Sequence, residues 1–570
     1  MAPELSVLHG STDQSLWTIT LGSLIDVQAR AHGHRTALVV PWQNVRRSYK
    51  NLATRSKIIA KALLQSGLQY GDCIGIMAGN CSEYIEVFLG AARIGVTSVV
   101  LNSNYTPTEL HYAVSFSDIK QLFIARFPGP KLNFTAHIER VSSTNRSVQI
   151  VVFDDDEHAQ RKDLTVEHFK AFYAKGQSSS TSDTKLLQTE ALVCPADTLN
   201  LQFTSGTTGA PKAAMLSHIN LINNAHLLGD RIGLTETDII CCPPPLFHCF
   251  GLVMGFLCAF TRGSSIVYPS QQFDAALVLK AIEAERCTFL HGVPTMFTAQ
   301  LDENAKRYYD LGSLKTALAA GSQVPQKLVN RLEKEMGISR VLIAYGMTET
   351  SPVTFCARSD DTVEQRLSTV GTLLPHTGVK VVDVDGRVVP RGVAGEICTS
   401  GYALQKGYLK DVRKTDEVME IGPSGTRWMH TGDQGILDGD GYLRITGRIK
   451  DLIIRGGENI VPAEIEERLL ANPSIVEAAV VGVPHEKYGE AVACFLRQAE
   501  QTPRPTVAEL AAWVRETLGR HKTPEHVWWV GDASVGDDFP KTASGKHQKH
   551  ILRKIGTEIV KAKSPMRPRL

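Results

Sequence analysis

Apolar positions along much of the chain alternate between helical and strand-like spacing. They recur with helical spacing from Asn51 to Ser66, and Gly67 follows as a helix stop. Short apolar runs at Cys73–Met77 and Val96–Leu101 flank a second helical pattern at Ser82–Ile94. Helices that alternate with short apolar strands predict a parallel α/β sheet.

Three further strands end in polar or glycine-containing segments. They are Thr288–His291, Leu314–Ala319 and Arg340–Ala344. Ligands of open α/β sheets bind beyond the carboxyl ends of the strands. We therefore expect a common crevice there, which would also take the segment Thr204–Lys212.

The predicted secondary structure changes in character twice in the last third of the sequence. Short strands separated by Gly and Asp turns, such as Gly395–Thr399 and Tyr442–Thr446, predict a small antiparallel barrel-like piece. Beyond Arg448, a helix at Pro462–Leu470, a strand at Ile475–Val483 and a helix at Val507–Leu518 predict a small α+β domain. We place the boundary between a domain of residues 1–449 and one of residues 450–570.

The segment Thr204–Lys212 carries hydroxyls, glycines and a lysine in one connection. A strand at Leu199–Phe203 precedes it and a helix at Ser217–Leu228 follows, so we expect a strand-to-helix loop. Glycine lets the backbone approach an anion, and hydroxyls, N–H groups and Lys212 suit a polyphosphate. It is not a Walker A loop, because no Gly-Lys-Ser/Thr closes it.

Composition narrows the class of protein. The 570 residues are 43% hydrophobic and 21% charged, and the net charge of +2 gives no electrostatic reason for nucleic-acid binding. The 11 cysteines are scattered, which favours a reducing compartment. Cys241, Cys242, His248 and Cys249 cluster without a second ligand pair, so a metal is not expected there. No signal peptide is read, and the apolar run Phe250–Phe260 is too short to span a bilayer.

Five motifs occur in a fixed order along most of the chain. They are Thr204–Lys212, Tyr345–Thr350, Thr431-Gly432-Asp433, Gly447–Asp451 and Pro540–Lys546. Together they resemble the adenylate-forming superfamily of acyl-CoA synthetases, luciferases and peptide-synthetase adenylation domains. Pro245–Gly251 adds a resemblance to medium-chain acyl-CoA synthetases. Departures from the family pattern are Ala213 for Gly, and His547 and Lys549 for Ile and Arg.

The resemblance implies an α/β fold and a nucleotide site. The fold is a large N-terminal domain of stacked α/β sheets with a barrel-like piece, hinged to a small α+β domain. Lys546, Glu349, Thr204 and Lys212 would be catalytic, with Glu349 also the Mg²⁺ ligand. The ATP-binding residues would be Thr204, Ser205, Gly206, Thr207, Thr208, Gly209, Ala210, Pro211, Lys212, Gly321, Tyr345, Gly346, Met347, Thr348, Glu349, Asp433, Arg448 and Lys546.

The same resemblance implies an acyl pocket, a thiol channel and a hinge. The acyl pocket would be lined by His248, Phe250, Val293, Thr295, Met296, Gly321, Thr350 and Val353. Gly456, Gly457 and Glu458 would contact coenzyme A, and Lys450 would be the hinge where backbone torsions reorient the small domain.

These residues predict an ATP- and Mg²⁺-dependent acid–thiol ligase. It would activate a carboxylic acid, medium-chain or modified aliphatic, as acyl-AMP and pass it to coenzyme A. The alternatives are a stand-alone adenylating enzyme that loads a carrier protein, a luciferase-like oxygenase and an inactive binding scaffold. No nucleic-acid partner and no stable membrane insertion are expected, and the oligomeric state is unreadable.

The last three residues, Pro568-Arg569-Leu570, resemble a peroxisomal import signal. They predict a peroxisomal protein that meets an import receptor. If the signal does not work, the expected location is the cytoplasm.

Overall fold

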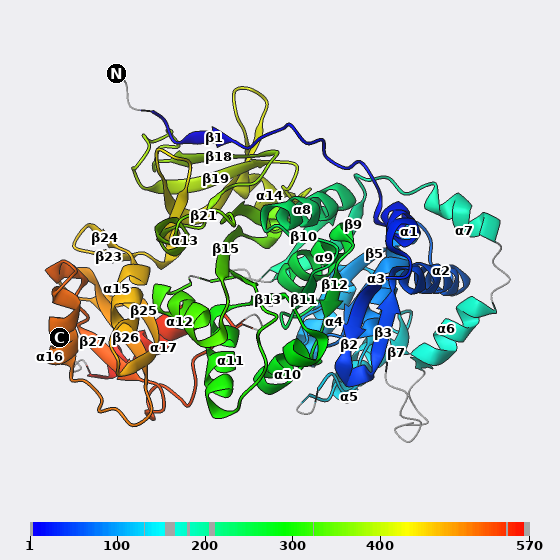
Figure 1. Ribbon diagram of the computed structural model, residues 1–570. Helices are drawn as coiled ribbons and strands as arrows, with labels where there is room; N and C mark the ends of the chain where they lie inside the picture. The colour runs from blue at the N-terminus through cyan, green and yellow to red at the C-terminus, as the bar shows by residue number, and fades with distance from the viewer. Residues whose placement is uncertain are drawn as a thin grey trace.

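The computed structural model describes residues 4–129, 132–153, 166–178, 183–204, 211–322, 324–542 and 545–563. These residues form sheets of seven, nine, six and five strands, and the five-stranded sheet lies entirely after residue 452 (Figure 1). The expected α/β class, with a large N-terminal part and a smaller C-terminal one, is confirmed. In the described part of the chain, no helix is both long and apolar enough to cross a membrane.

The seven-stranded sheet is parallel except at one edge, where β10 runs antiparallel to β9. Its strand order is β10-β9-β5-β4-β6-β7-β8. The strands are β4 (Cys73–Met77), β5 (Thr97–Val100), β6 (Ile119–Ile124), β7 (Gln149–Val152), β8 (Glu167–His168), β9 (Thr198–Thr204) and β10 (Lys212–Ser217).

The nine-stranded sheet has a parallel centre and antiparallel edges. Its order is β17-β16-β15-β14-β13-β11-β12-β2-β3. The strands are β2 (Thr36–Val40), β3 (Val45–Ser48), β11 (Ile239–Cys241), β12 (Ser265–Val267), β13 (Phe289–Gly292), β14 (Thr316–Ala320), β15 (Arg340–Gly346), β16 (Val353–Cys356) and β17 (Thr372–Leu373).

The largest apolar core lies between these two sheets. β4 contributes Ile74 and Ile76 to it, and β14 contributes Leu318, while the next residues, Met77 and Ala319, join cores on the outer faces. Alternate side chains of a strand point to opposite faces, so both faces are covered and the strands read as continuous apolar runs. The helical segments that share the central core are α1 (Leu21–His32), α2 (Tyr49–Gln65), α3 (Ser82–Arg93), α6 (Phe169–Gln177), α7 (Asp183–Glu190), α8 (His218–Arg231), η3 (Phe250–Leu257) and α9 (Cys258–Arg262).

Further helices cover the outer faces. α4 (Pro107–Phe116) and α5 (Thr135–Thr144) pack on the seven-stranded sheet. α10 (Ala275–Glu285), α11 (Pro294–Lys306) and α12 (Gln326–Met336) pack on the nine-stranded sheet. The expected crevice at the carboxyl ends of β13, β14 and β15 is present, because Pro294 after β13, Ala320 and Gly321 at the end of β14, and Tyr345 and Gly346 of β15 line one cleft.

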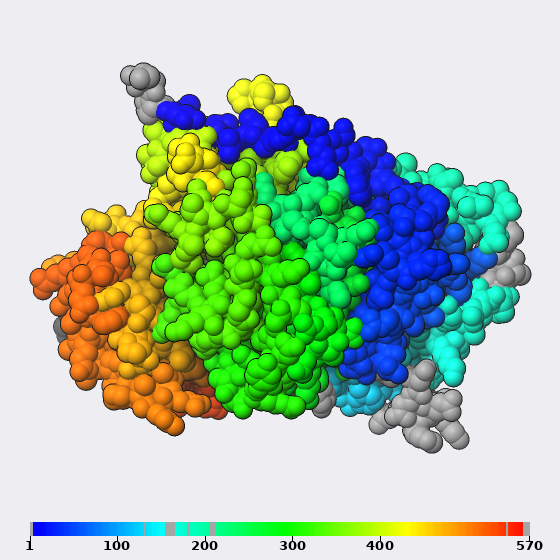
Figure 2. Space-filling model, in the orientation of Figure 1, coloured from blue at the N-terminus to red at the C-terminus, as the bar shows by residue number. Residues whose placement is uncertain are grey.

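The six-stranded sheet corresponds to the expected barrel-like piece, and its described strands form an open sheet, not a closed barrel. Its strands are β1 (Val7–His9), β18 (Thr377–Val382), β19 (Gly395–Gly401), β20 (Met419–Ile421), β21 (Arg427–Leu437) and β22 (Leu443–Arg448). The helix α14 (Val412–Val418) contacts β20 and β21, whereas α13 (Val363–Ser368) contacts β15 and α12. The N-terminal segment runs across the surface to place β1 at the edge of this sheet (Figures 1 and 2).

The C-terminal part is a separate α+β layer. Its strands are β23 (Ile453–Arg455), β24 (Glu458–Ile460), β25 (Ile475–His485), β26 (Gly489–Gln498) and β27 (His526–Trp529), and its helices are α15 (Pro462–Leu470), α16 (Val507–Arg515) and α17 (Lys549–Lys563). A short 3₁₀ turn, η5 (Ile449–Asp451), connects β22 to β23 and contains Lys450.

One sequence expectation is wrong. The segment after Thr204 was expected to lead from a strand into a helix, whereas Lys212 begins β10, which pairs with β9 in register Lys212↔Thr204. The connection is therefore the loop of an antiparallel hairpin, and α8 starts only after Ser217, whose side chain caps it. Ser205, Gly206, Thr207, Thr208, Gly209 and Ala210 lie outside the described residues.

Candidate functional site

A cleft of about 2620 Å³ lies between the large N-terminal part and the small C-terminal layer. Typical small-molecule pockets measure roughly 300–1,000 Å³, so this space accommodates more than one ligand. Many residues named from the sequence line it: Thr204, Pro211, Lys212, His248, Phe250, Thr295, Gly321, Tyr345, Gly346, Met347, Thr348, Glu349, Val353, Asp433, Arg448, Lys450 and Lys546.

The Asp433 carboxylate is held by two partners. Tyr345 donates its hydroxyl to Oδ2 at 2.8 Å, and Arg448 donates Nε to Oδ1 at 3.1 Å. Asp433 lies directly opposite Arg448 in the β21–β22 ladder, which brings the two side chains together. Each carboxylate oxygen has a further lone pair, so the clamped group can still accept hydroxyls from a ligand.

Glu349, Tyr408 and Lys212 form a second group. The buried Glu349 accepts the Tyr408 hydroxyl at Oε1 over 2.9 Å, and the Lys212 ammonium lies 4.8 Å from the centre of the Tyr408 ring. Residue 408 is bridged to Ala214 of β10, so one strand positions both Lys212 and Tyr408. Sequence reasoning missed Tyr408, because no motif assigned to the site contains it.

Lys546 reaches the same cleft from the C-terminal layer. Gly321 has φ +94°, and a Cβ there would lie 3.2 Å from Val293 Cγ1 and 3.7 Å from Lys546 Cε. A side chain at this position would therefore be strained and would crowd the lysine. Burial and the nearby Arg448 charge lower the pKa of Lys546 to about 8, against the opposing effect of Asp433 and Glu349.

The segment around Lys546 is anchored by Glu477. The Glu477 carboxylate lies 2.5 Å from Lys541 Nζ, 2.8 Å from His547 Nε2 and 3.0 Å from Arg497 Nε. Burial acts to raise the pKa of Glu477, but the bonds from His547 and Lys541 outweigh it and lower the pKa to about 2. His547, a departure from the family pattern, thus helps to hold the lysine segment in place.

Some of the acyl-pocket candidates line the cleft and others do not. His248, Phe250, Thr295 and Val353 line the cleft. Burial and the Lys546 charge lower the pKa of His248 to about 3, so its imidazole is neutral, and Nδ1 accepts the Phe250 N–H at 3.1 Å. Val293 packs beside Gly321 and within 3.4 Å of a Cβ placed on Gly545.

The structure does not bring Met296 or Thr350 to the cleft lining. Met296 is buried in the central apolar core. Thr350 donates its hydroxyl to carbonyls of Met347 and Pro352, and so shapes the turn that carries Glu349.

The coenzyme A candidates lie apart from the cleft in this conformation. Gly456, Gly457 and Glu458 belong to the turn that joins β23 to β24 and do not line the cleft. Gly457 has φ +87°, and a Cβ there would meet no atom within 4 Å. Pro568, Arg569 and Leu570 lie outside the described residues.

Comparisons with known proteins match both parts of the chain. The family model of AMP-binding enzymes matches residues 25–409, and that of the AMP-binding enzyme C-terminal domain matches residues 464–546. Acyl-CoA ligase sidI of Beauveria bassiana is 45% identical over 566 residues, which cover 99% of this chain and 96% of that protein. The mitochondrial medium-chain acyl-CoA ligase ACSF2 of Danio rerio is 36% identical, over 96% of this chain and 90% of that protein.

Solved structures share the fold over nearly the whole chain. The anthranilate CoA ligase AuaEII in complex with anthranoyl-AMP superposes with a TM-score of 0.84 at 24% identity, covering 97% of this chain and 99% of that one. ATP-bound MatB from Rhodopseudomonas palustris gives a TM-score of 0.81 at 26% identity, covering 95% and 100%. The chain therefore belongs to the AMP-binding enzyme family, as an AMP-forming acyl-CoA ligase.

Proposed function

We propose that this enzyme works in two steps, with an acyl-AMP intermediate. The observation that carries the proposal is the meeting of Lys546 with Gly321, Arg448, Asp433 and Glu349 in one cleft. Cationic and anionic groups from both parts of the chain thereby surround one site that is large enough for a nucleotide and an acid.

The first step joins two negative reactants. A carboxylate oxygen of the acid bonds to the α-phosphorus of ATP, and pyrophosphate leaves. Positive groups must offset the repulsion and hold the reactants in line. We assign this role to Lys546 and Lys212, with Thr204 and the hairpin loop around the phosphates and Asp433 on the ribose hydroxyls.

Glu349 offers a type of ligand that suits a Mg²⁺ ion. It presents carboxylate oxygens in the cleft, and Mg²⁺ prefers oxygen ligands. A bound Mg²⁺ would neutralise charge on the phosphates of ATP. The Tyr408 hydroxyl holds the carboxylate in place through Oε1.

The second step needs another arrangement of the small domain. The thiolate of coenzyme A attacks the acyl carbon, the bond to phosphate breaks, and AMP leaves. Gly456, Gly457 and Glu458 lie away from the cleft here, so we propose that residues 450–570 rotate about Lys450 relative to residues 1–449 and bring this turn to the acyl group.

For the acid we propose a medium-chain or modified aliphatic carboxylic acid. Neutral His248 with Phe250 and Val353 gives an uncharged lining, which favours an acyl chain over an amino acid. The ACSF2 relative is named a medium-chain acyl-CoA ligase, which supports this chain length, and the name of the sidI relative supports acyl-CoA ligation without specifying the acid. Loading of a carrier protein is the alternative.

The test is a product assay on purified protein with ATP, Mg²⁺, coenzyme A and a panel of carboxylic acids. We expect AMP, pyrophosphate and acyl-CoA in equal amounts. ADP and phosphate as products would contradict the chemistry. Acyl-AMP that is passed to a carrier-protein phosphopantetheine but not to coenzyme A would support the alternative.

We also propose that the protein enters peroxisomes through Pro568-Arg569-Leu570. The support is the resemblance of this tripeptide to an import signal, with basic Lys561 and Arg567 upstream. A fluorescent protein that carries residues 560–570 at its C-terminus should collect in peroxisomes, and the same fusion without Leu570 should not. Diffuse cytosolic signal from both fusions would overturn the proposal in favour of the cytoplasm.

A further inference from the structure

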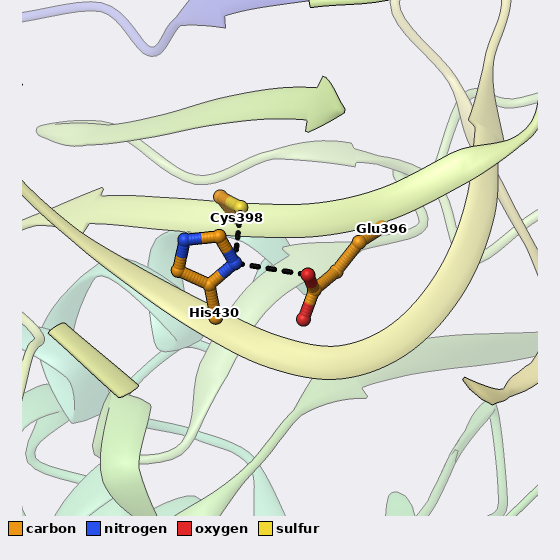
Figure 3. Close-up of side chains that lie close together, drawn as sticks. All are labelled: Glu396, Cys398 and His430. Atoms are coloured by element: carbon orange, nitrogen blue, oxygen red, sulfur yellow. Dashed lines mark hydrogen bonds and ion pairs between the residues drawn. The ribbon is translucent and has the colours of Figure 1, made fainter. Parts of the chain in front are cut away.

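Three side chains of different ligand types converge on the six-stranded sheet, beside the cleft that contains Glu349 and Lys546. Glu396 and Cys398 are alternate residues of β19 and therefore share a face of that strand. His430 of β21 lies directly opposite Cys398 in the ladder. Figure 3 shows the carboxylate and the thiol both pointing toward the same ring nitrogen of His430.

The distances within this group suit a small ion. His430 Nδ1 lies 2.9 Å from Glu396 Oε2 and 3.4 Å from Cys398 Sγ. All three potential ligand atoms lie within 4.8 Å of one another. Tetrahedral zinc with bonds of about 2.0–2.3 Å places its ligand atoms roughly 3.3–3.6 Å apart. Small side-chain movements would therefore open the centre of the group to one ion.

His430 and Glu396 also have hydrogen-bond or ion-pair partners outside the group, of the kind that hold metal ligands in place. The second ring nitrogen of His430, Nε2, faces Glu420 Oε2 at 3.5 Å, and Glu420 is in turn paired with Lys380. The other carboxylate oxygen of Glu396, Oε1, accepts the Gly432 N–H at 3.1 Å. A histidine whose remote nitrogen meets a carboxylate is the usual support of a metal-bound imidazole, because it fixes the ring and its tautomer.

We propose that Glu396, Cys398 and His430 bind one Zn²⁺ ion, with water as the fourth ligand. A thiolate and an imidazole select Zn²⁺ over Mg²⁺, which takes oxygen ligands. The ion enters from the cleft, which Glu396 and His430 line and where their side chains are 23% and 29% exposed. Cys398 itself is fully buried.

A bound ion would cross-link β19 to β21 at His430, two residues before Gly432 and three before Asp433. The metal ligands are the thiolate and the neutral imidazole, so binding would release protons. Because an ion that binds only the folded chain stabilises it by mass action, Zn²⁺ should raise the unfolding temperature.

The experiment uses the full-length protein after treatment with a chelator. Zn²⁺ is titrated against a chromogenic chelator, and Co²⁺ is titrated as a spectroscopic substitute. We expect one equivalent to bind, a thiolate-to-cobalt absorption band, and a rise in unfolding temperature with Zn²⁺ but not with Mg²⁺.

Four variants locate the ion. Cys398→Ser should abolish the cobalt band and weaken Zn²⁺ binding by more than about 100-fold, since a direct ligand is worth more than a supporting one. Glu396→Gln should weaken binding without removing the band. Glu420→Gln should weaken binding by about 10-fold, within the 10–100-fold range of supporting contacts. The matched control Cys194→Ser removes an exposed cysteine outside the group and should change nothing.

Two results would overturn the proposal. One is the failure of the wild-type protein to bind an equivalent of Zn²⁺, which would leave the three residues as a hydrogen-bonded group only. The other is equal binding by the wild type and Cys398→Ser, with the metal-free variant unfolding at the wild-type temperature to show that it is folded.

Discussion

The hydroxyl of Tyr408 donates to Oε1 of Glu349 across 2.9 Å, although 59 residues separate the two in the chain. The same phenol ring lies beneath the Lys212 ammonium at 4.8 Å. Tyr408 therefore fixes a buried carboxylate with its polar end and a cation with its face. Tyr408 thereby links the proposed Mg²⁺ ligand to the proposed phosphate lysine.

Replacing Tyr408 by Phe keeps the ring under Lys212 and removes the donor to Glu349. We expect acyl-AMP formation to slow by about 10-fold, which corresponds to about 1.4 kcal/mol for one buried charge-assisted bond, and to need more Mg²⁺. Pyrophosphate release at several Mg²⁺ concentrations measures this. Tyr402→Phe, which removes another buried tyrosine hydroxyl, is the control and should retain the parent Mg²⁺ dependence. An unchanged rate in Tyr408→Phe would show that Glu349 is positioned without it.

Lys546→Ala should separate the two half-reactions. The Lys546 ammonium reaches the cleft from the C-terminal layer, so it can stabilise charge only in the conformation in which that layer covers the cleft. We assign this conformation to acyl-AMP formation, so loss of the ammonium should slow pyrophosphate release by about 10²–10³. Conversion of pre-made acyl-AMP and coenzyme A to acyl-CoA should stay near the parent rate. Equal slowing of both steps would contradict the two-conformation argument.

Gly457→Leu should show the reverse pattern, because a bulky side chain would obstruct the path of the thiol. Since Gly457 has φ +87°, any side chain there strains the turn, and Gly457→Ala controls for that strain. Both half-reactions are assayed in both variants. If Gly457→Leu leaves the thioester step unaffected, this turn does not line the thiol channel.

The pH dependence of acyl-AMP formation should have a basic limb set by Lys546. Its pKa is lowered to about 8, and a lysine carries its charge only below its pKa. The kcat/KM for ATP in pyrophosphate release reports the free enzyme and should therefore fall as the pH rises through about 8. Lys546→Arg keeps a charge at every accessible pH and should lose this limb, whatever its absolute rate. Persistence of the limb in that variant would assign it to another group.

Glu477→Gln should loosen the segment that carries Lys546. It removes the charge shared by Lys541, His547 and Arg497, so we expect acyl-AMP formation to fall by about 10-fold and the thioester step to change little. Glu525→Gln removes two longer ion pairs elsewhere in the same layer, to Arg455 and His485, and controls for the loss of a carboxylate charge from this layer. Equal loss in both variants would indicate general destabilisation.

Acid unfolding checks the same contact independently. The pKa of Glu477 is lowered to about 2, so its ion pairs contribute stability above the unfolded value of about 4.3 and lose it as the pH falls toward 2. The unfolding free energy of the wild type should therefore fall more steeply over that window than that of Glu477→Gln. Parallel curves would show that the contact does not stabilise the fold.

The local pattern of apolar and polar residues was sufficient to predict many helices and strands of this protein. The strand Cys73–Met77 and the helix Pro462–Leu470 have the bounds that their periodicity predicts. A buried parallel strand and an amphipathic helix each carry their burial pattern in consecutive residues, so no distant contact is needed to recognise them. The resemblance that the motifs carry likewise implies one site for Lys212, Glu349, Asp433, Arg448 and Lys546, and all five line the cleft.

The tertiary structure decided what depends on pairing between distant residues. Lys212–Ser217 contains alanines and a methionine that also suit a helix, but pairing with β9 and the bridge from Ala214 to Tyr408 makes it a strand. No local signal links Tyr408 to Glu349, His547 to Glu477, or His430 to Cys398. The register of two strands or the packing of two layers brings the residues of each pair together. Burial of the whole core fixes this register and packing, because a shift of one residue would turn the apolar side chains of a strand away from the core.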